Sequence, residues 1–582
     1  MIRGATRPGL SVLSRTDTPD PITNGTQITV LSRIDILIIA AYLCGIVSLG
    51  FWAGRRRRKG GEGSHYFLAG NTLTWPVIGL AMFAANISTV HLVSLAESAY
   101  KYGLVYGNFE WMAGFTLVLL SLFFAPLYLR SRVTTLPDYL ERRYNRECRD
   151  WLAVISIVSA IVIHIGVALY TAAWVLRGIL GISPAATIMG IDALLFFIII
   201  IGVLTGIYTM MGGLLAVVLT ESAQTVLLIA GAMVITVVGF MRVGGWGGLA
   251  STLATQPHPM AGSGAVTWGT GNFLGLLRPA GDPSGLPWYS IFLGYPVLGI
   301  WYWCCDQTIV QRVLAAKDDR HARLGPLFCA SVKILPVFFF VLPGVICVAL
   351  VQQGVLGRGP VAPADTYTFM IMHLLPAGLK GLIAAAMLAA AMQTCSAALN
   401  STATLVAYDI VKRRRPGTSD HELVTIGKRV TVAATVLAIA LSPLFGHYGT
   451  IIEGLNRLIS FIAPPITAVF LFGVFWKKAS GRGAYITLLV GACAGFIAFV
   501  LDWYGWYRGN FMMTAFYLLV FCALVMTGAS LALPEPLKEE AKGLVWERWR
   551  DALQGEWRGP GDYRLLAALV VGVFILLYCV FR

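Results

Sequence analysis

Apolar segments of about twenty residues recur along the whole chain, separated by short polar loops. A helix of about twenty apolar residues spans the hydrocarbon of a bilayer, where backbone polar groups must be satisfied within the protein. The pattern therefore predicts an all-α polytopic membrane protein with about 14 transmembrane helices. We expect these helices at 34–54, 74–98, 107–129, 151–180, 185–210, 214–240, 287–312, 325–352, 376–411, 428–446, 450–476, 483–502, 511–534 and 562–581.

The charges support this interpretation and predict an orientation. Only 13% of the residues are charged, against about 25% in soluble domains. The net charge of +15 comes from Lys and Arg clusters in alternate loops, as the positive-inside bias distributes them, and does not indicate nucleic acid. The basic run at 55–59 should be cytoplasmic, which puts both termini outside a plasma or inner membrane. Residues 1–33 then form an extracellular or periplasmic N-terminal segment.

The segment 535–561, predicted to be cytoplasmic, combines tryptophans with charges. Trp546, Trp549, Leu553 and Trp557 recur at near-helical spacing, with Arg and Glu between them. This spacing favours an amphipathic helix at the membrane interface, and a partner-binding helix is the alternative.

A run of polar residues interrupts the second apolar segment at 84–94, A-A-N-I-S-T-V-H-L-V-S. It brings an amide (Asn86), an imidazole (His91) and the hydroxyls of Ser88, Thr89 and Ser94 into the middle of a span. In lipid these groups leave costly unmet hydrogen bonds unless they face a cavity or a partner. We therefore expect this helix to be broken at mid-membrane, where it holds an ion and a solute.

Six further motifs identify a known family. In order they are H-Y-F-L-A-G (65–70), F-E-W-M (109–112), T-L-P-D-Y-L-E-R-R-Y (135–144), W-Y-W-C-C-D-Q-T-I-V-Q-R (301–312), A-L-N-S-T-A-T-L (398–405) and F-G-V-F-W-K-K (472–478). The chain resembles the solute:sodium symporter family, and specifically its sodium/glucose cotransporter branch.

The resemblance implies an architecture of two inverted five-helix repeats whose first helices are broken. The repeats would cover 74–240 and 287–476, after a leading transmembrane helix at 34–54. Three additional helices would follow in 483–582. Inverted repeats with discontinuous helices at the midplane are a general pattern among secondary transporters.

The resemblance also implies a sodium site between the broken helix and the helix at 376–411. Sodium prefers oxygen ligands, which unwound carbonyls and hydroxyls supply. Carried over, the ligands are Ala84, Ile87, Ala390, Gln393 and Thr394, with Ala and Ile acting through carbonyls. Gln393 stands where the family has Ser, and Glu221, linked to sodium coupling, stands in T-E-S-A-Q for the family's Asp. Thr394 bonding back to its own helix is the alternative.

For the solute, the resemblance implies Asn86, His91, Glu110, Lys333 and Asn456. A sugar offers many hydroxyls, so its site needs several donors and acceptors, which carboxylate, ammonium and amide groups provide. Tyr302 would be the aromatic inner gate, with Trp303 beside it.

Each residue also has a structural interpretation. Glu110 is alternatively a solvated surface carboxylate and His91 a helix–helix contact. Tyr302 and Trp303 are alternatively packing aromatics, whereas a functional or paired role is favoured for Lys333. We expect Asp306 and Arg312 to form a structural ion pair or gate rather than bind solute.

The leading hypothesis is a sodium-coupled secondary active symporter that imports a sugar or similar polar solute by alternating access. Alternatives are another small solute (a polyol, inositol or organic acid), coupling to protons, no coupling, and a transporter-like sensor. No nucleophile motif, phosphate loop or metal cluster suggests an enzyme, and we expect no cofactor and no metal other than sodium. The partners implied are the solute, sodium and the lipid bilayer, with no nucleic acid and no obligate protein partner.

Overall fold

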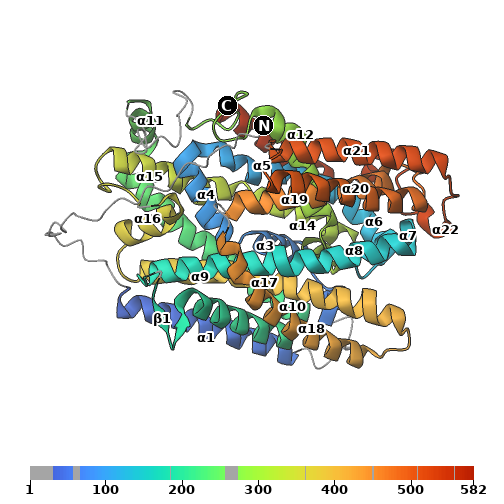
Figure 1. Cartoon of the computed structure of the whole chain (residues 1–582), viewed down its shortest axis with the longest axis horizontal. Coiled ribbons are helices and arrows are strands. Elements are labelled where there is room, and N and C mark those ends of the chain that lie inside the picture. Colours follow the sequence, from blue (N-terminus) through green and yellow to red (C-terminus); the bar gives the residue numbers. More distant parts are fainter. Residues whose placement is uncertain are drawn as a thin grey trace, which may run out of the picture.

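Helices make up most of the structure, and the long ones run along the long axis of the molecule (Figure 1). The structure is a computed structural model that describes residues 31–56, 66–183, 185–255, 273–360, 362–447, 451–507, 509–555 and 557–582. Of the predicted N-terminal segment 1–33, all but the last three residues lie outside the described ranges.

The first half of the chain contains ten of the described α-helices and one hairpin. The helices are α1 (Arg33–Arg56), α3 (Trp75–Asn86), α4 (Thr89–Tyr102), α5 (Asn108–Leu119), α6 (Ala125–Ser131), α7 (Leu136–Arg143), α8 (Arg146–Ser159), α9 (Val167–Ile179), α10 (Ala193–Arg242) and α11 (Gly245–Thr255). The antiparallel hairpin β1 (Thr187–Ile188) and β2 (Ile191–Asp192) precedes α10. The span predicted from 185 therefore begins too early. Asp192 ends the hairpin and caps α10 by accepting a hydrogen bond from the Leu195 amide at 3.0 Å.

The second half continues with twelve described α-helices. They are α12 (Trp288–Ile300), α13 (Gln307–Leu314), α14 (Asp319–Val332), α15 (Leu342–Gln352), α16 (Thr366–Leu374), α17 (Leu379–Leu405), α18 (Asp420–Leu441), α19 (Ile451–Phe475), α20 (Gly481–Trp503), α21 (Phe511–Ala532), α22 (Glu539–Lys542) and α23 (Tyr563–Val580). Short 3₁₀ turns lie at Ala69–Asn71, Gly103–Gly107, Pro363–Asp365, Ser442–His447, Trp549–Leu553 and Gly559–Gly561.

By length and composition, 11 helices in the described part of the chain are able to cross a membrane. The shorter apolar helix α3 adds to them. The count of 14 and the division into repeats stay predictions.

Five π-helical turns widen these spans. They lie at Leu120–Phe124, Ala160–Gly166, Trp301–Cys305, Val337–Val341 and Val406–Lys412. Because π-turns are frequent at functional sites, their positions direct attention to the middle of the bundle.

The apolar segment with the polar run is interrupted, as its residues predict. Helix α3 ends at Asn86, Ile87 and Ser88 are extended, and α4 begins at Thr89. The Ser88 amide does not continue the helix by donating to Ala84 and instead donates to Nδ1 of His91 at 3.2 Å. The Ala84 carbonyl thereby loses its helical donor.

The span predicted at 287–312 is interrupted as well. Its π-turn ends at Cys305, Asp306 has an extended conformation (φ −88°, ψ 124°), and α13 follows. The Asp306 carboxylate caps α13 by accepting a hydrogen bond from the Thr308 amide at 2.7 Å. Two polar side chains, His91 and Asp306, thus accept backbone amides at helix starts in the interior of the bundle.

Helix α10 is 50 residues long but bends at Gly213. Gly213 has φ +63°, a backbone conformation that residues other than glycine rarely adopt. A Cβ there would lie 2.7 Å from the Tyr66 ring and 2.8 Å from the Tyr66 carbonyl. The bend lies between the two spans predicted at 185–210 and 214–240.

The leading helix α1 is tied to α17 through a buried carboxylate. Oδ1 of Asp35 accepts hydrogen bonds from the amides of Gly378 and Gly381, both at 2.7 Å. These amides belong to the first turn of α17, where backbone donors lack helical partners. A Cβ on Gly381 would lie 2.5 Å from the Asp35 backbone, so the two helices are in close contact at this point.

The segment 535–561 is not a single helix, so that prediction was wrong. It contains the four-residue α22 and two 3₁₀ turns, because Pro536 and Gly543 break the helix before the tryptophans and Gly555 interrupts their spacing. Trp546 is 4% exposed, and its indole donates to the Phe123 carbonyl at 2.9 Å.

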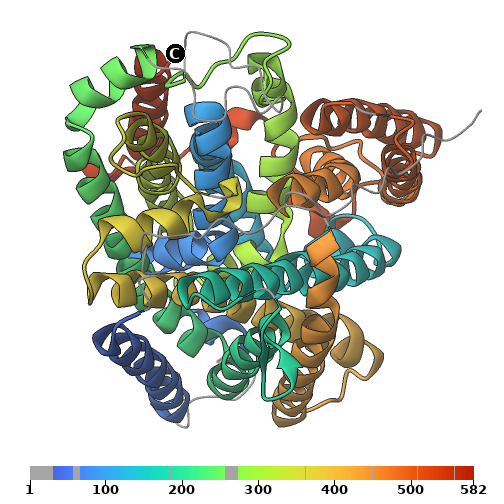
Figure 2. The same cartoon turned by 60° about the vertical axis from the view of Figure 1, so that its left-hand side comes forward.

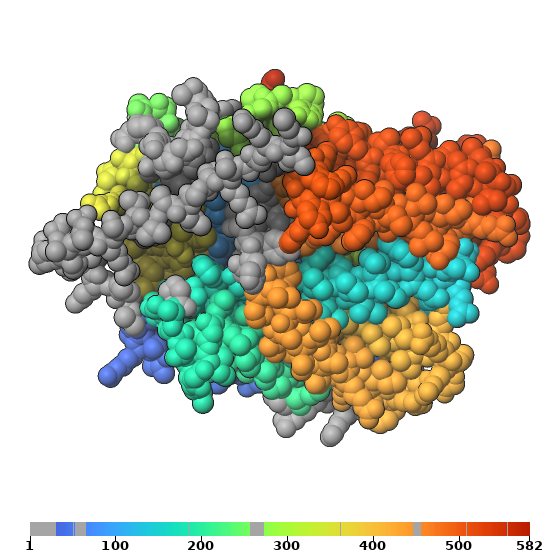
Figure 3. Space-filling model, viewed as in Figure 1, coloured from blue at the N-terminus to red at the C-terminus, as the bar shows by residue number. Residues whose placement is uncertain are grey.

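Helix α1 and the helix pair α20 and α21 occupy opposite flanks of the bundle (Figures 1 and 2). The space-filling view shows the same division, with the orange-to-red part of the chain forming one flank (Figure 3). Between these flanks, α17 is almost entirely buried.

Candidate functional site

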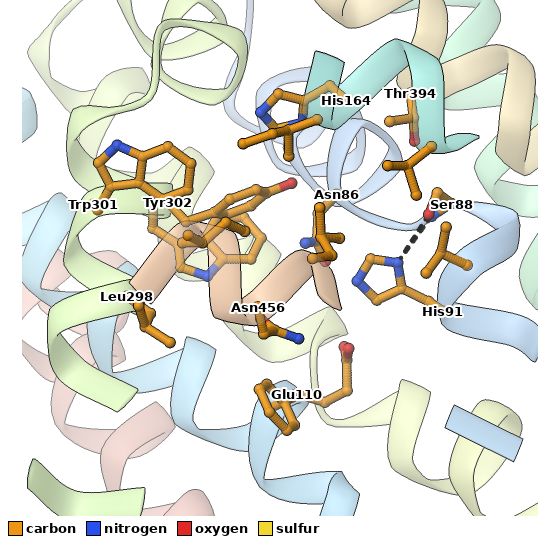
Figure 4. A pocket seen from close by; sticks show the side chains of 18 of the residues that line it. Asn86, Ser88, His91, Glu110, His164, Leu298, Trp301, Tyr302, Thr394 and Asn456 are labelled. Carbon is orange, nitrogen blue, oxygen red and sulfur yellow. Dashed lines mark hydrogen bonds between the residues drawn. The ribbon is translucent and has the colours of Figure 1, made fainter. Parts of the chain in front are cut away.

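A cavity of about 130 Å³ lies where the two interrupted spans meet (Figure 4). Its walls come from α3, α4, α5, α9, α12, α17, α19, the π-turns at 160–166 and 301–305, and Lys333 at the end of α14. All seven predicted solute and gate residues line it, namely Asn86, His91, Glu110, Lys333, Asn456, Tyr302 and Trp303. The sequence separations are large, so the fold alone brings them together.

Lys333 is the centre of the polar wall. It is 1% exposed, and its ammonium lies 2.5 Å from Oε2 of Glu110. It also donates to Oδ1 of Asn86. Glu110 is 2% exposed, so its interpretation as a surface carboxylate is wrong. The ion pair lines the cavity and leaves no net charge between these two groups.

His91 joins the helix break to the cavity. Its Nδ1 faces both the amide and the hydroxyl of Ser88 at 3.2 Å. A backbone amide only donates, so Nδ1 accepts and the proton of the neutral ring resides on Nε2. His91 therefore has a structural role as a helix cap and still lines the cavity as a donor (Figure 4).

Aromatic side chains form the opposite wall. The Tyr302 and Trp303 rings pack edge to face with centroids 5.2 Å apart, and the Lys333 ammonium lies 5.4 Å from the Trp303 ring centre. The Tyr302 hydroxyl points toward Asn86 (Figure 4). Trp303 is 2% exposed while Tyr302 is only partly buried, so Tyr302 presents more of its surface to the cavity.

Sequence reasoning missed His164, which lines the cavity from the π-turn at 160–166. Its Nε2 lies 3.3 Å from Oδ2 of Asp306, and its ring centre lies 6.0 Å from that of Tyr302. A titratable residue inside an apolar span is by itself a signal of function, and that signal was available at 164.

The expected pair between Asp306 and Arg312 does not form. Asp306 faces His164, whereas Arg312 donates to Oε1 of Glu221 at 2.6 Å. Residues six apart on a helix lie on different faces, since only i+3 and i+4 neighbours meet. The prediction of this ion pair was wrong for that reason.

The predicted sodium ligands lie around the break and on α17. Thr394 lines the same cavity as Ser88 (Figure 4), and the Thr89 hydroxyl donates to the Met387 carbonyl of α17 at 2.9 Å. The two helices are therefore in contact one turn from Ala390. The Thr394 hydroxyl also lies 3.4 Å from the Ala390 carbonyl, a long hydrogen bond that leaves it able to accept a cation.

Gln393 is directed away from the break. Its Nε2 donates to the Glu221 carbonyl at 3.4 Å, and its Oε1 is buried with no hydrogen-bond partner in the described structure. Both Glu221 and Arg312 are 0% exposed. Oε2 of Glu221 and Nε of Arg312 likewise lack partners within the described ranges.

The oxygen atoms of the predicted sodium ligands fit a sodium ion in part. Around the break, the Ala84 carbonyl and the Thr394 hydroxyl are oxygen groups of the kind that sodium binds. Gln393 contributes an amide oxygen only if its side chain changes conformation. The predicted coupling residue Glu221 is already neutralised by Arg312.

Comparison with known proteins places the whole chain among sodium-coupled transporters. The profile of the sodium:solute symporter family matches residues 66–491. The chain is 32% identical to a sodium/mannose cotransporter of Bos taurus, covering 97% of this chain and 98% of the relative. It is 34% identical to sodium/glucose cotransporter 2 of Rattus norvegicus, covering 81% of this chain and 72% of the relative.

The fold has a solved counterpart in the substrate-bound, outward-open state of a Na⁺-coupled sialic acid symporter. The two structures superpose with a TM-score of 0.72 at 22% identity, over 87% of this chain and 99% of the other. Together with the family profile and the relatives above, these findings show that the chain is a member of the sodium:solute symporter family.

Proposed function

We propose that this protein is a sodium-coupled symporter that imports an uncharged, polyhydroxylated solute such as a hexose by alternating access. The observation that carries the proposal is the cavity wall in which Lys333 is paired with Glu110 and Asn86. Ammonium, carboxylate and amide groups together donate to and accept from hydroxyl groups. Tyr302 adds an aromatic face for the apolar surface of a sugar ring.

The charge balance of the cavity favours an uncharged solute. The cation Lys333 already faces Glu110, and His164 faces Asp306. A solute carboxylate would need to displace Glu110 from Lys333 and leave a buried anion without its partner, which is costly. Mannose and glucose, which name the relatives, are both uncharged sugars.

Sodium would bind between the break and α17, using the Ala84 and Ile87 carbonyls, Ala390 and Thr394. Binding there would hold α3 and α4 against α17 and favour the solute-competent state. In the proposed architecture, 14 spans form two inverted repeats at 74–240 and 287–476, with both termini outside. We assign no enzymatic step to the protein.

Uptake into liposomes containing the purified protein tests the proposal. We expect accumulation of one or more neutral hexoses or polyols when the sodium gradient is directed inward, and little uptake of hexuronates or sialic acid. Transport of an organic acid in preference to every neutral sugar would refute the solute assignment.

Proton coupling, or no coupling, is the second candidate, and Gln393 and Glu221 favour it. The Gln393 side chain donates to the Glu221 carbonyl, and the Glu221 carboxylate is paired with Arg312. Neither side chain therefore points to the helix break. The same liposomes distinguish the candidates. Uptake that follows a pH gradient would indicate proton coupling, and uptake that is independent of the sodium and pH gradients would indicate no coupling.

A further inference from the structure

A second, larger cavity lies on the outside of the bundle, between α14 and α23. It has a volume of about 360 Å³ and is apolar apart from the Ser331 hydroxyl, which donates to the Leu327 carbonyl of its own helix at 3.1 Å. Leu327 and Val570 are 2% and 9% exposed, whereas Leu569 is 55% exposed. The cavity is therefore a groove with a buried floor and an open rim.

The groove faces the hydrocarbon of the bilayer. Both helices that form it belong to segments long and apolar enough to cross a membrane. Its lining on α14 runs from Leu324 to Ser331, a rise of about 10 Å, and Ile334 lines it just beyond the end of that helix. That is about a third of a hydrocarbon core of roughly 30 Å, so the groove fits within one leaflet and matches part of one lipid tail.

Arginines surround the mouth of the groove. Arg320 precedes Leu324 by one helical turn, and its Nη2 lies 3.5 Å from the place of a Cβ on Gly561, just before α23. Arg320 is exposed, as is Arg558 three residues before Gly561. Within the described ranges no ion pair is found for either side chain.

Neighbouring arginines, in contrast, are already paired. Arg323 lies 2.8 Å from Asp319, and Arg564 lies 2.8 Å from Asp562. Trp557, beside Arg558, is 63% exposed, and tryptophan is enriched at the level of lipid headgroups. The Arg320 guanidinium thus stands beside Gly561 at the start of α23, with Arg558 three residues earlier in the chain, and neither side chain has an ion pair in the described structure.

We propose that this groove binds an anionic phospholipid, with one acyl chain along α14 and α23 and its phosphate on Arg320 and Arg558. A guanidinium group offers paired donors that match phosphate geometry. Juxtamembrane arginines also attract anionic lipids more than zwitterionic ones.

The lipid would contact the inner half of the broken helix. Trp75, the first residue of α3, lines the groove and packs on Phe328 with ring centroids 5.2 Å apart. A Cβ on Gly79 would lie 2.7 Å from the Phe328 ring, so α3 and α14 are closely packed. A lipid in the groove would therefore stabilise one position of α3, a consequence that rests on the proposed function.

Native mass spectrometry of the delipidated full-length protein tests the lipid site without any solute. We expect phosphatidylglycerol to bind at lower concentration than phosphatidylcholine. Each of Arg320→Gln and Arg558→Gln should weaken phosphatidylglycerol binding about fivefold and leave phosphatidylcholine binding unchanged. Arg429→Gln, an exposed arginine on α18, is the matched control and should change neither.

Two results would overturn the proposal. One is equal binding of the two lipids by the unsubstituted protein, and the other is an unchanged preference after Arg320 and Arg558 are both replaced. Val570→Trp fills the floor of the groove and should weaken both lipids alike. Since these measurements use no solute, failed transport would not refute the lipid site, and failed lipid selectivity would refute the lipid site without refuting sodium-driven uptake.

Discussion

Two buried carboxylate–cation pairs lie in the middle of the bundle, and their surroundings differ. Lys333 and Glu110 line a cavity and share Asn86 as a further partner. Arg312 and Glu221 form an ion pair away from that cavity. Nε of Arg312 and Oε2 of Glu221 are buried and have no hydrogen-bond partner among the described residues. The comparison suggests that the first pair exchanges partners with a solute, while the second holds α10 against α13.

The largest effect is expected where no solvent can relieve an unpaired charge. Arg312→Met leaves Glu221 buried without its cation, which should lower the free energy of unfolding by about 3–5 kcal/mol. Adding Glu221→Gln should recover most of this loss. Thermal unfolding of the detergent-solubilised protein measures both, and a double variant no more stable than the single one would refute a closed structural pair.

Lys333→Gln should affect solute rather than fold. The loss of a hydrogen bond to charged groups, about 1.5–3 kcal/mol, corresponds to a roughly tenfold to hundredfold higher KM for the solute. The sodium concentration that gives half-maximal uptake should change little. Lys101→Gln, which breaks the pair between Lys101 and Glu97 in α4, is the control. Equal losses in both variants would contradict the special role of the cavity pair.

Thr394→Ala tests the ion side of the same cavity. Removal of one oxygen ligand should raise the half-saturating sodium concentration about fivefold to tenfold. We take the lost contact to be comparable to one hydrogen bond, which contributes about 1 kcal/mol net. Thr394→Ser should restore sodium affinity. Thr402→Ala is a matched control because, among the described residues, the Thr402 hydroxyl bonds to its own helix alone, at 2.8 Å from the Ala398 carbonyl. A similar shift in the control would mean that helix packing, not sodium, is affected.

Gln393→Ser should give the smallest change. It places a hydroxyl where the family has one and removes the long hydrogen bond to the Glu221 carbonyl. We expect sodium affinity to rise about twofold to fivefold, with the solute KM unchanged and a stability loss of about 0.5–1 kcal/mol. Sodium titrations of uptake decide this, and a fall in sodium affinity would show that the amide oxygen of Gln393 is itself a ligand.

The sequence predicts the elements that depend on local composition. The apolar segments indicate the helices, and the polar residues at 84–94 indicate a break, because both signals arise within a single segment. The grouping of Lys333 with Glu110 and Asn86 followed only from the family resemblance, since no local pattern tells which distant residues meet.

The failures also have physical causes. The partner of Asp306 is His164, 142 residues away, whereas the nearer Arg312 stands at a helical spacing that forbids the contact. The tryptophan spacing at 535–561 indicated a helix, but proline and glycine override side-chain periodicity. The family resemblance predicts the position of Gln393 but not the direction of its longer side chain.

The carboxylate of Asp35 makes α1 follow any tilt of α17, because it holds two amides of the first turn of that helix. A probe on α1 is therefore a reporter for the helix that carries Thr394. Cys44 is exposed on α1 and offers a native attachment point for a spin label or fluorophore. Motion of the ion-binding helix can thus be followed from the rim of the bundle, without altering any residue of the cavity.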